Sequence, residues 1–94
     1  MSHPNIHPYL DASTAHLPAH LLVRIEAIDG VIAREFKWGW WLWVPDNVPG
    51  HLADYARIPD AIAALWRFAR AHECDWILLD ADGPEVAGLP TYEH

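Results

Sequence analysis

Residues 31–44 have the sequence VIAREFKWGWWLWV, and this stretch decides the fold because β-branched and aromatic residues dominate it. Lys37 marks either a bend between two extended pieces or a point within one long strand. A period of two places these side chains on opposite faces: Trp38, Trp40, Leu42 and Val44 on one, and Gly39, Trp41 and Trp43 on the other. Either both faces are covered, or Trp41 and Trp43 form an exposed interaction patch.

The C-terminal side of this stretch predicts a loop, a helix and a strand. Residues 45–50, PDNVPG, are rich in turn-forming residues and predict the loop. Pro59 suits a helix start, and the helix after it has an apolar stripe on one side and polar residues facing water on the other. The stripe is Ile62, Leu65, Trp66 and Ala69, and the water-facing residues are Asp60, Arg67 and Arg70. Residues 76–79 form a short apolar run that predicts a central strand.

The N-terminal side predicts another helix. Apolar residues recur at helical spacing at Leu17, Leu21, Ile25 and Ile28, and Asp29-Gly30 supplies a helix end. We therefore expect one helix over residues 17–29, with Pro18 in its first turn. Residues 9–13 give a weaker strand signal.

The resulting order of strands and helices is β-α-β-α-β. It predicts an α/β fold (α+β-like), with a small single-layer sheet of three or four strands and two helices packed on it. We expect a single domain over residues 1–94, with a flexible lead-in at 1–8 and an irregular tail at 81–94. The predicted core is Leu21, Ile25, Ile62, Leu65, Trp66, Ile77 and Leu79. The strand order stays open.

Charge and composition limit the classes of function. Thirteen acidic and six basic residues give a net charge of −7, which repels phosphate backbones and favours either solubility alone or a basic partner. Cys74 is the only cysteine, so no intrachain disulfide forms. The start of the chain does not resemble a signal peptide, and the longest apolar stretch, residues 38–45, is far below the roughly 20 residues of a membrane span. We expect a cytoplasmic protein that binds neither nucleic acid directly nor membranes.

Asp80-Ala81-Asp82-Gly83 follows an apolar strand and resembles the phosphoryl-transfer motif of haloacid-dehalogenase-like phosphatases. In those enzymes the first carboxylate is the nucleophile and the second is an acid/base. Here Pro84 stands where that family has a hydroxyl residue, and no lysine follows to bind phosphate. We therefore interpret the segment as a turn capped by aspartates.

His16 and His20 have the i, i+4 spacing with which two imidazoles bind a metal from one helical face. Pro18 disturbs that spacing, and a third ligand would have to come from His51, His72 or the acidic tail. Cys74 lies near His72 in sequence, but a small apolar residue between a helix and a strand is more often buried and inert. We expect no metal, no cofactor and no catalytic residue.

Several segments follow one another along the chain: Ser13-Thr14-Ala15-His16, Gly39-Trp40, the helix after Pro59, residues 74–83 and Leu89-Pro90-Thr91-Tyr92. Together they resemble a family of short bacterial proteins of unknown function that occur on plasmids, integrative elements and phage-derived DNA. Members of that family end in Tyr/Phe-Asp-Trp, where this chain has Tyr92-Glu93-His94. The resemblance implies a mobile-element context and no known reaction.

Two classes of function follow. The first is an acidic protein-binding module, such as an inhibitor of a host defence protein of the CRISPR type or of another basic nucleic-acid-handling protein. Its expected binding residues are Trp41, Trp43, Asp46, Asp54 and Asp60, and a homodimer is compatible with it. The alternative is an unrecognised metal-dependent enzyme that uses His16, His20 and the Asp80/Asp82 loop.

Overall fold

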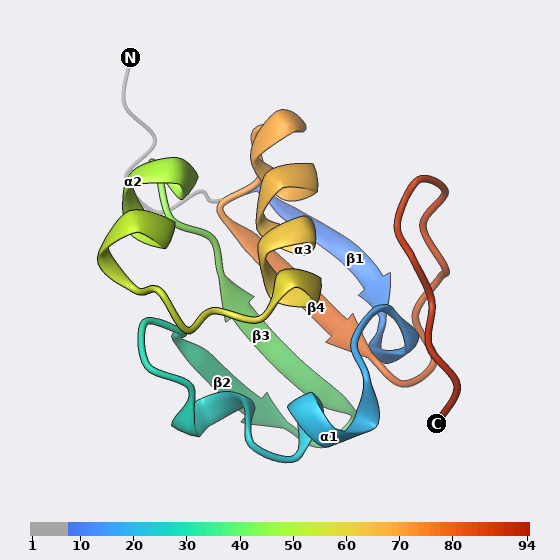
Figure 1. The fold of residues 1–94 in the computed structure, drawn as a ribbon. Helices are drawn as coiled ribbons and strands as arrows, with labels where there is room; N and C mark the ends of the chain where they lie inside the picture. The colour runs from blue at the N-terminus through green and yellow to red at the C-terminus, as the bar shows by residue number, and fades with distance from the viewer. Residues whose placement is uncertain (1–7) are drawn as a thin grey trace.

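The computed structural model describes residues 8–94. Along the chain the elements are β1 (Tyr9–Ser13), the 3-10 turn η1 (Thr14–His16), α1 (Ala19–Leu22), the 3-10 turn η2 (Ile25–Ala27), β2 (Ala33–Phe36), β3 (Gly39–Trp43), α2 (Val48–Asp54), α3 (Asp60–Ala71) and β4 (Trp76–Asp80). The four strands form one mixed sheet in the order β1-β4-β3-β2, with β1 parallel to β4 and β3 antiparallel to both its neighbours (Figure 1). The predicted α/β class with a single small sheet is confirmed.

The aromatic stretch forms a tight hairpin. Phe36 pairs with Gly39, so Lys37 and Trp38 are the two turn residues, and of the two alternatives for this stretch the bend at Lys37 is the one that the structure shows. A Cβ at residue 39 would collide with the carbonyl oxygen of Leu79, so glycine is what allows β3 to lie against β4 here.

The two faces of the sheet have different surroundings. Side chains on one face are fully buried beneath the helices, as at Ala12, Leu42, Ile77 and Leu79. Figure 1 shows α3 lying across this face. On the opposite face, among the described residues, α2 reaches only the end of β3 at Trp43, and no helix covers the middle, where Trp41 and Leu78 are only half-buried. We call this second face the open face.

The core lies between the helices and the covered face of the sheet. All seven predicted core residues are buried: Leu21 is 4% exposed, Leu65 is 1% exposed, and the other five are completely enclosed. The predicted stripe of the second helix is also confirmed, since α3 buries Ile62, Leu65, Trp66 and Ala69.

The continuous helix predicted over residues 17–29 is wrong. The segment contains one α-helical turn, α1, followed by the 3-10 turn η2. Pro18 precedes α1 without a side-chain cap, and Arg24 leaves the helical conformation at φ −128°. Leu17, Leu21, Ile25 and Ile28 are nevertheless all buried, so the apolar spacing predicted burial correctly but not helical continuity.

The loop predicted over residues 45–50 is wrong in its second half, where α2 begins. Asn47 caps this helix, because its side-chain oxygen accepts a hydrogen bond from the Gly50 N–H at 3.2 Å. Pro49 lies in the first turn, where a missing N–H breaks no helical bond. The same turn-forming residues are therefore a helix start.

Residues 81–94 contain neither helix nor strand, yet the rest of the domain holds them in place. Their backbone is hydrogen-bonded to the end of β1 and to the turn after it: the Pro84 carbonyl accepts from the Ser13 N–H at 2.8 Å, and the Tyr92 N–H donates to the Ala15 carbonyl at 2.7 Å. Val86 and Leu89 pack against the core. The lead-in predicted at residues 1–8 lies outside the described residues except for Pro8.

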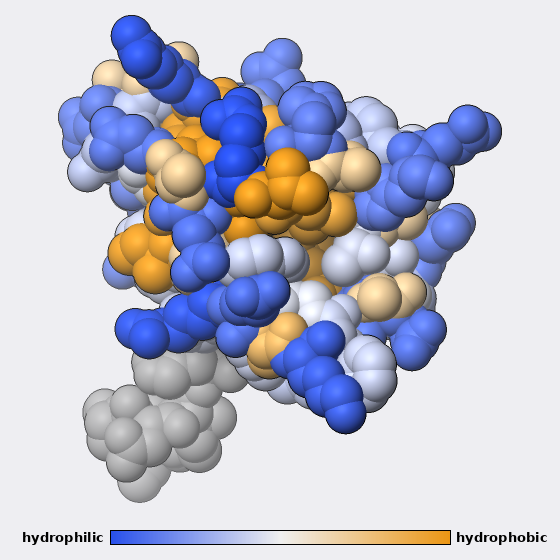
Figure 2. All heavy atoms as spheres, turned by 90° about the horizontal axis from the view of Figure 1, so that it is seen from below, coloured by the Kyte–Doolittle hydropathy of each residue, from blue (hydrophilic) through white to orange (hydrophobic). Residues whose placement is uncertain are grey.

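The underside of the domain has an apolar patch surrounded by hydrophilic side chains (Figure 2). α1 lies at this end of the molecule (Figure 1), and Val23, directly after it, is 85% exposed.

Candidate functional site

The open face carries a cluster of aromatic rings from three strands. The Trp41 ring on β3 contacts Tyr9 of β1 edge-on, with ring centroids 5.2 Å apart, and Phe36 of β2 at 6.4 Å. Leu78 of β4 pairs with Trp41 in the sheet and lies between these strands. Tyr9 is 52% exposed, and the other three are half-buried. Trp41 is thus the centre of an accessible aromatic surface that spans the sheet.

Charged groups border this cluster on two sides. Asp11 on β1 and Asp80 on β4 share the face of Tyr9 and Leu78 by strand alternation. Arg34 on β2 lies on the opposite side of the cluster, and Lys37 in the hairpin turn places its ammonium 4.7 Å from the Trp38 ring centre. The open face is acidic along β1 and β4 and basic along β2.

Trp43 has different surroundings from Trp41. Its ring packs edge-on against His51 of α2 at 5.6 Å, and His51 also contacts the buried Trp66 of α3 at 5.3 Å. His51 is fixed by a 2.7 Å hydrogen bond between its Nε2 and the Gly30 carbonyl. The Trp43 ring is therefore held in place by neighbouring aromatic rings and is not free to insert into a partner protein.

A surface hollow of about 310 Å³ opens beside Trp43. Asp46 and Asp54 line it together with Trp43, so the structure brings three of the five predicted binding residues to one place. Trp41 belongs to the open face instead, and Asp60 lies exposed in the first turn of α3. The hollow, which we call the acidic hollow, combines one aromatic wall with two carboxylates.

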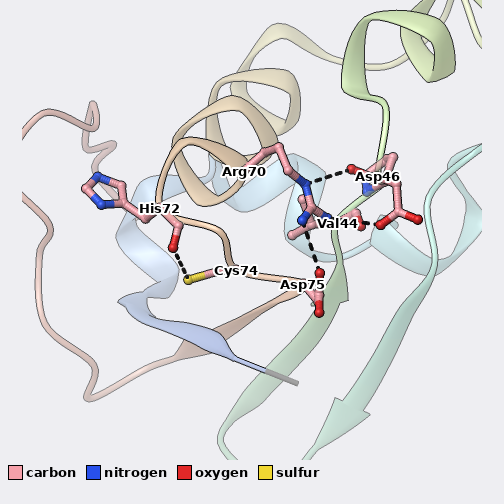
Figure 3. A network of polar contacts seen from close by, with 7 residues as sticks. Val44, Asp46, Arg70, His72, Cys74 and Asp75 are labelled. Carbon is pink, nitrogen blue, oxygen red and sulfur yellow. Dashed lines mark hydrogen bonds and ion pairs between the residues drawn. The ribbon is translucent and has the colours of Figure 1, made fainter. Parts of the chain in front are cut away.

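Arg70 was predicted to face water, and this is wrong. Its side chain is only 28% exposed and donates to the carbonyls of Val44 at 3.1 Å and Pro45 at 3.2 Å, and to the Asp75 carboxylate at 3.0 Å (Figure 3). The Asp46 carboxylate lies 3.6 Å from the same guanidinium. Arg70 therefore joins the end of β3 to the start of β4 and positions one wall of the acidic hollow.

His16 and His20, the pair of the alternative metal-enzyme hypothesis, do not converge on one point. His16 is 1% exposed, its Nε2 accepts the Val86 N–H at 2.8 Å, and its Nδ1 lies 2.8 Å from the Pro90 carbonyl. The acceptor role of Nε2 makes Nδ1 the protonated nitrogen. His20 is exposed. Both ring nitrogens of His16 are thus engaged in holding the tail.

The other predicted chemical groups also have structural partners. The Asp80 carboxylate accepts the Asp82 N–H at 2.9 Å, so the Asp-x-Asp segment forms a turn that is capped by Asp80. Cys74 is buried and contacts the His72 carbonyl, while the His72 ring stacks on Phe68 (Figure 3 labels Cys74 and His72). Within residues 8–94, no three His, Cys, Asp or Glu side chains are grouped as a metal ion requires.

None of the described helices is both long and apolar enough to span a bilayer. Comparison with curated proteins gives no significant match, and comparison with solved structures gives none either. Residues 9–94 do match one sequence family, described as the C-terminal domain of a family of unknown function, DUF5983. The match includes every strand and helix described above, from β1 to the tail, and on this basis the chain belongs to the DUF5983 C-terminal domain family.

Proposed function

We propose that this domain is a protein-binding module whose open face receives a partner protein. The observation that carries the proposal is the aromatic cluster of Tyr9, Phe36 and Trp41, which spans three strands without a covering helix among the described residues. Tryptophan and tyrosine side chains are the residues that most often dominate the energy of protein interfaces, because they bury a large area at low entropic cost.

The charge of the domain supports a basic partner. Its net charge of −7 favours encounter with a positively charged surface and disfavours binding to nucleic acid directly. Asp11 and Asp80 place negative charge beside the aromatic cluster. The partner that fits this surface is therefore a protein with a basic patch around an apolar centre.

The acidic hollow supports the same chemistry. A lysine or arginine side chain entering it would meet the carboxylates of Asp46 and Asp54 and the ring of Trp43. Cations are attracted both to carboxylates and to the face of an indole ring. We therefore assign the acidic hollow a secondary role, as an acceptor for one basic side chain of the partner.

We further propose that the domain acts in the mobile-element context that its sequence resemblance implies, as an inhibitor of a basic nucleic-acid-handling protein. Host defence complexes of the CRISPR type are such targets, because their nucleic-acid channels are positively charged. A small domain with this negative charge and an accessible aromatic face can compete for such a channel or its rim.

Photo-crosslinking from the two phenylalanines tests this proposal. A photo-reactive phenylalanine analogue replaces Phe36, on the open face, or Phe68, on α3, in otherwise unchanged protein, and the variants are irradiated in host lysate. We expect the Phe36 variant to crosslink a basic protein that the Phe68 variant does not, and we expect Trp41→Ala to abolish the adduct. Equal labelling from both positions, or a crosslink only to a second copy of the chain, would contradict the proposal.

A further inference from the structure

We propose that the outer edge of β2 is a strand-addition site for an extended, basic segment of another protein. This site differs from the open face and from the acidic hollow, and it does not depend on the function proposed for them. It rests on three features of the underside of the domain: a free strand edge, two adjoining hollows, and two unpaired carboxylates.

The strand edge follows from the register of the hairpin. Trp43 N–H donates to the Ile32 carbonyl at 2.9 Å, and hydrogen-bonded pairs alternate along an antiparallel ladder. Arg34 and Phe36 therefore direct their backbone groups toward β3, whereas Ala33 and Glu35 direct theirs outward. Within residues 8–94, no backbone or side-chain group accepts from or donates to those outward groups.

The opposite edge of the sheet, formed by β1, is partly covered, so an exposed backbone edge is a feature of β2 and not of both edge strands. At β1, the tail lies beside the strand end, and Pro84 accepts a hydrogen bond from the Ser13 N–H. An exposed strand edge is a ready template for another strand, and proteins usually cover or interrupt such edges. In this domain the tail covers part of one edge, and no described residue covers the other.

Two hollows adjoin the free edge. One, of about 520 Å³, runs along residues 31–35 and is also lined by Glu26. The second, of about 460 Å³, is lined by Leu22, Val23 and Trp40. Leu22 is the last residue of α1, so this hollow lies at the end of the domain where Figure 1 shows α1 and Figure 2 shows the apolar patch. The carboxylates of Glu26 and Glu35 line both hollows.

The negative charge of the two hollows favours a basic segment over a second copy of the chain. Glu26 and Glu35 are exposed, and neither forms an ion pair with a described residue. A lysine or arginine placed between them would gain two carboxylate partners. A second copy of the chain, paired edge to edge, would instead bring four glutamates into one groove, and like charges on facing strands are destabilising.

The spacing of side chains completes the description of the ligand. Alternate residues of a strand lie on the same side, about 7 Å apart. An added strand would bond to the backbone of Ala33 and Glu35, place a basic side chain between the glutamates, and place an apolar side chain two residues away against Leu22 and Val23. Main-chain bonds then supply affinity and the two side chains supply specificity, as in other cases of strand addition.

Amide hydrogen exchange measured by NMR tests this site on the full chain. The probe is an acetylated and amidated peptide of about seven residues in which threonine occupies every other position and lysine and valine take turns at the positions between, so that lysine and valine lie two residues apart on the same side of the strand. We expect the amides of Ala33 and Glu35 to exchange rapidly in the free protein and to become protected when the peptide binds. The amides of Arg34 and Phe36 should be protected in both states.

Two controls separate strand addition from charge attraction alone. A peptide N-methylated at alternate residues keeps its charge but loses backbone donors, and it should bind at least about tenfold more weakly. The double variant Glu26→Gln/Glu35→Gln should also lose about tenfold in affinity. Glu85→Gln, an exposed carboxylate in the tail, is the matched control and should not change affinity.

The proposal is overturned if the peptide does not protect Ala33 and Glu35, if the N-methylated peptide or the same peptide with glutamate in place of lysine binds equally well, or if these amides are already protected by self-association. Failure of the Phe36 crosslink would leave this site intact, because the two experiments probe different surfaces.

Discussion

Leu42 and Trp41 are neighbours on the same strand, yet they belong to regions with opposite roles. Leu42 points beneath the helices and is completely buried, whereas Trp41 lies half-buried on the open face among other aromatic rings. Both side chains are large and apolar, so hydrophobicity alone does not separate them. The difference shows that the covering helices decide which apolar face stabilises the fold and which is available to a partner.

The largest effect should come from the covered region. Leu65 on α3 is 1% exposed, and Leu65→Ala should lower the free energy of unfolding by about 2–5 kcal/mol, because it removes buried contacts and leaves a cavity. Urea denaturation followed by tryptophan fluorescence measures this. A change below about 0.5 kcal/mol, the size typical of surface substitutions, would refute the assignment of α3 to the core.

The attachment of the tail, residues 81–94, to the rest of the domain should depend on His16. His16→Ala removes the acceptor of the Val86 N–H and the partner of the Pro90 carbonyl, and it should cost about 1–3 kcal/mol. Hydrogen exchange at the Val86 amide should accelerate in this variant. His20→Ala is the matched control and should change neither quantity, because His20 is exposed. If both variants behave alike, His16 does not anchor the tail.

The comparison between the two faces predicts that removing the larger side chain, Trp41, lowers the free energy of unfolding less than removing Leu42. Trp41→Ala should lower stability by about 0.5–1.5 kcal/mol through lost aromatic contacts, while Leu42→Ala should cost about 2–5 kcal/mol. Thermal and urea unfolding of the two variants in parallel provide the measurement. A Trp41→Ala variant that is destabilised as much as Leu42→Ala would mean that the open face is part of the stabilising core.

The smallest expected effect is the change in melting midpoint when a metal ion is added. Because both ring nitrogens of His16 are engaged and His20 lies apart, equimolar zinc should shift the melting midpoint by about 1 °C or less. Untagged protein with and without chelator is compared by differential scanning calorimetry. Stoichiometric zinc that survives purification, and is lost together with stability in His20→Ala, would support a metal site.

The strands could be predicted from sequence because local signals are strong there. β-branched and aromatic residues predicted the extended chain that forms β2 and β3, a short apolar run predicted β4, and β1 gave a weaker signal. The helices were harder to predict from the sequence. Residues 17–29 have helical spacing but break after one turn, since burial of the same four apolar residues does not require continuous helical hydrogen bonds. α2 was missed because asparagine and proline favour both loops and helix starts.

The surroundings of the candidate site could be predicted only in part. The pattern of residues 38–44 left open whether Trp41 was covered, because coverage depends on where distant helices pack. Trp43 and Trp41 share a strand face in sequence, but α2 brings His51 against Trp43 alone. The role of Arg70 was missed because its carbonyl partners lie 25 and 26 residues away, and no local pattern encodes such contacts.

The affinity of the crosslinked partner for Trp41→Ala tests the central claim, that the open face binds protein while the covered face holds the fold. Titration calorimetry with the purified partner should show binding weakened by about 2 kcal/mol or more, with the variant still folded. Arg67→Ala, on the exposed side of α3, should bind like the wild type. Unchanged affinity in the folded Trp41→Ala variant would contradict the claim.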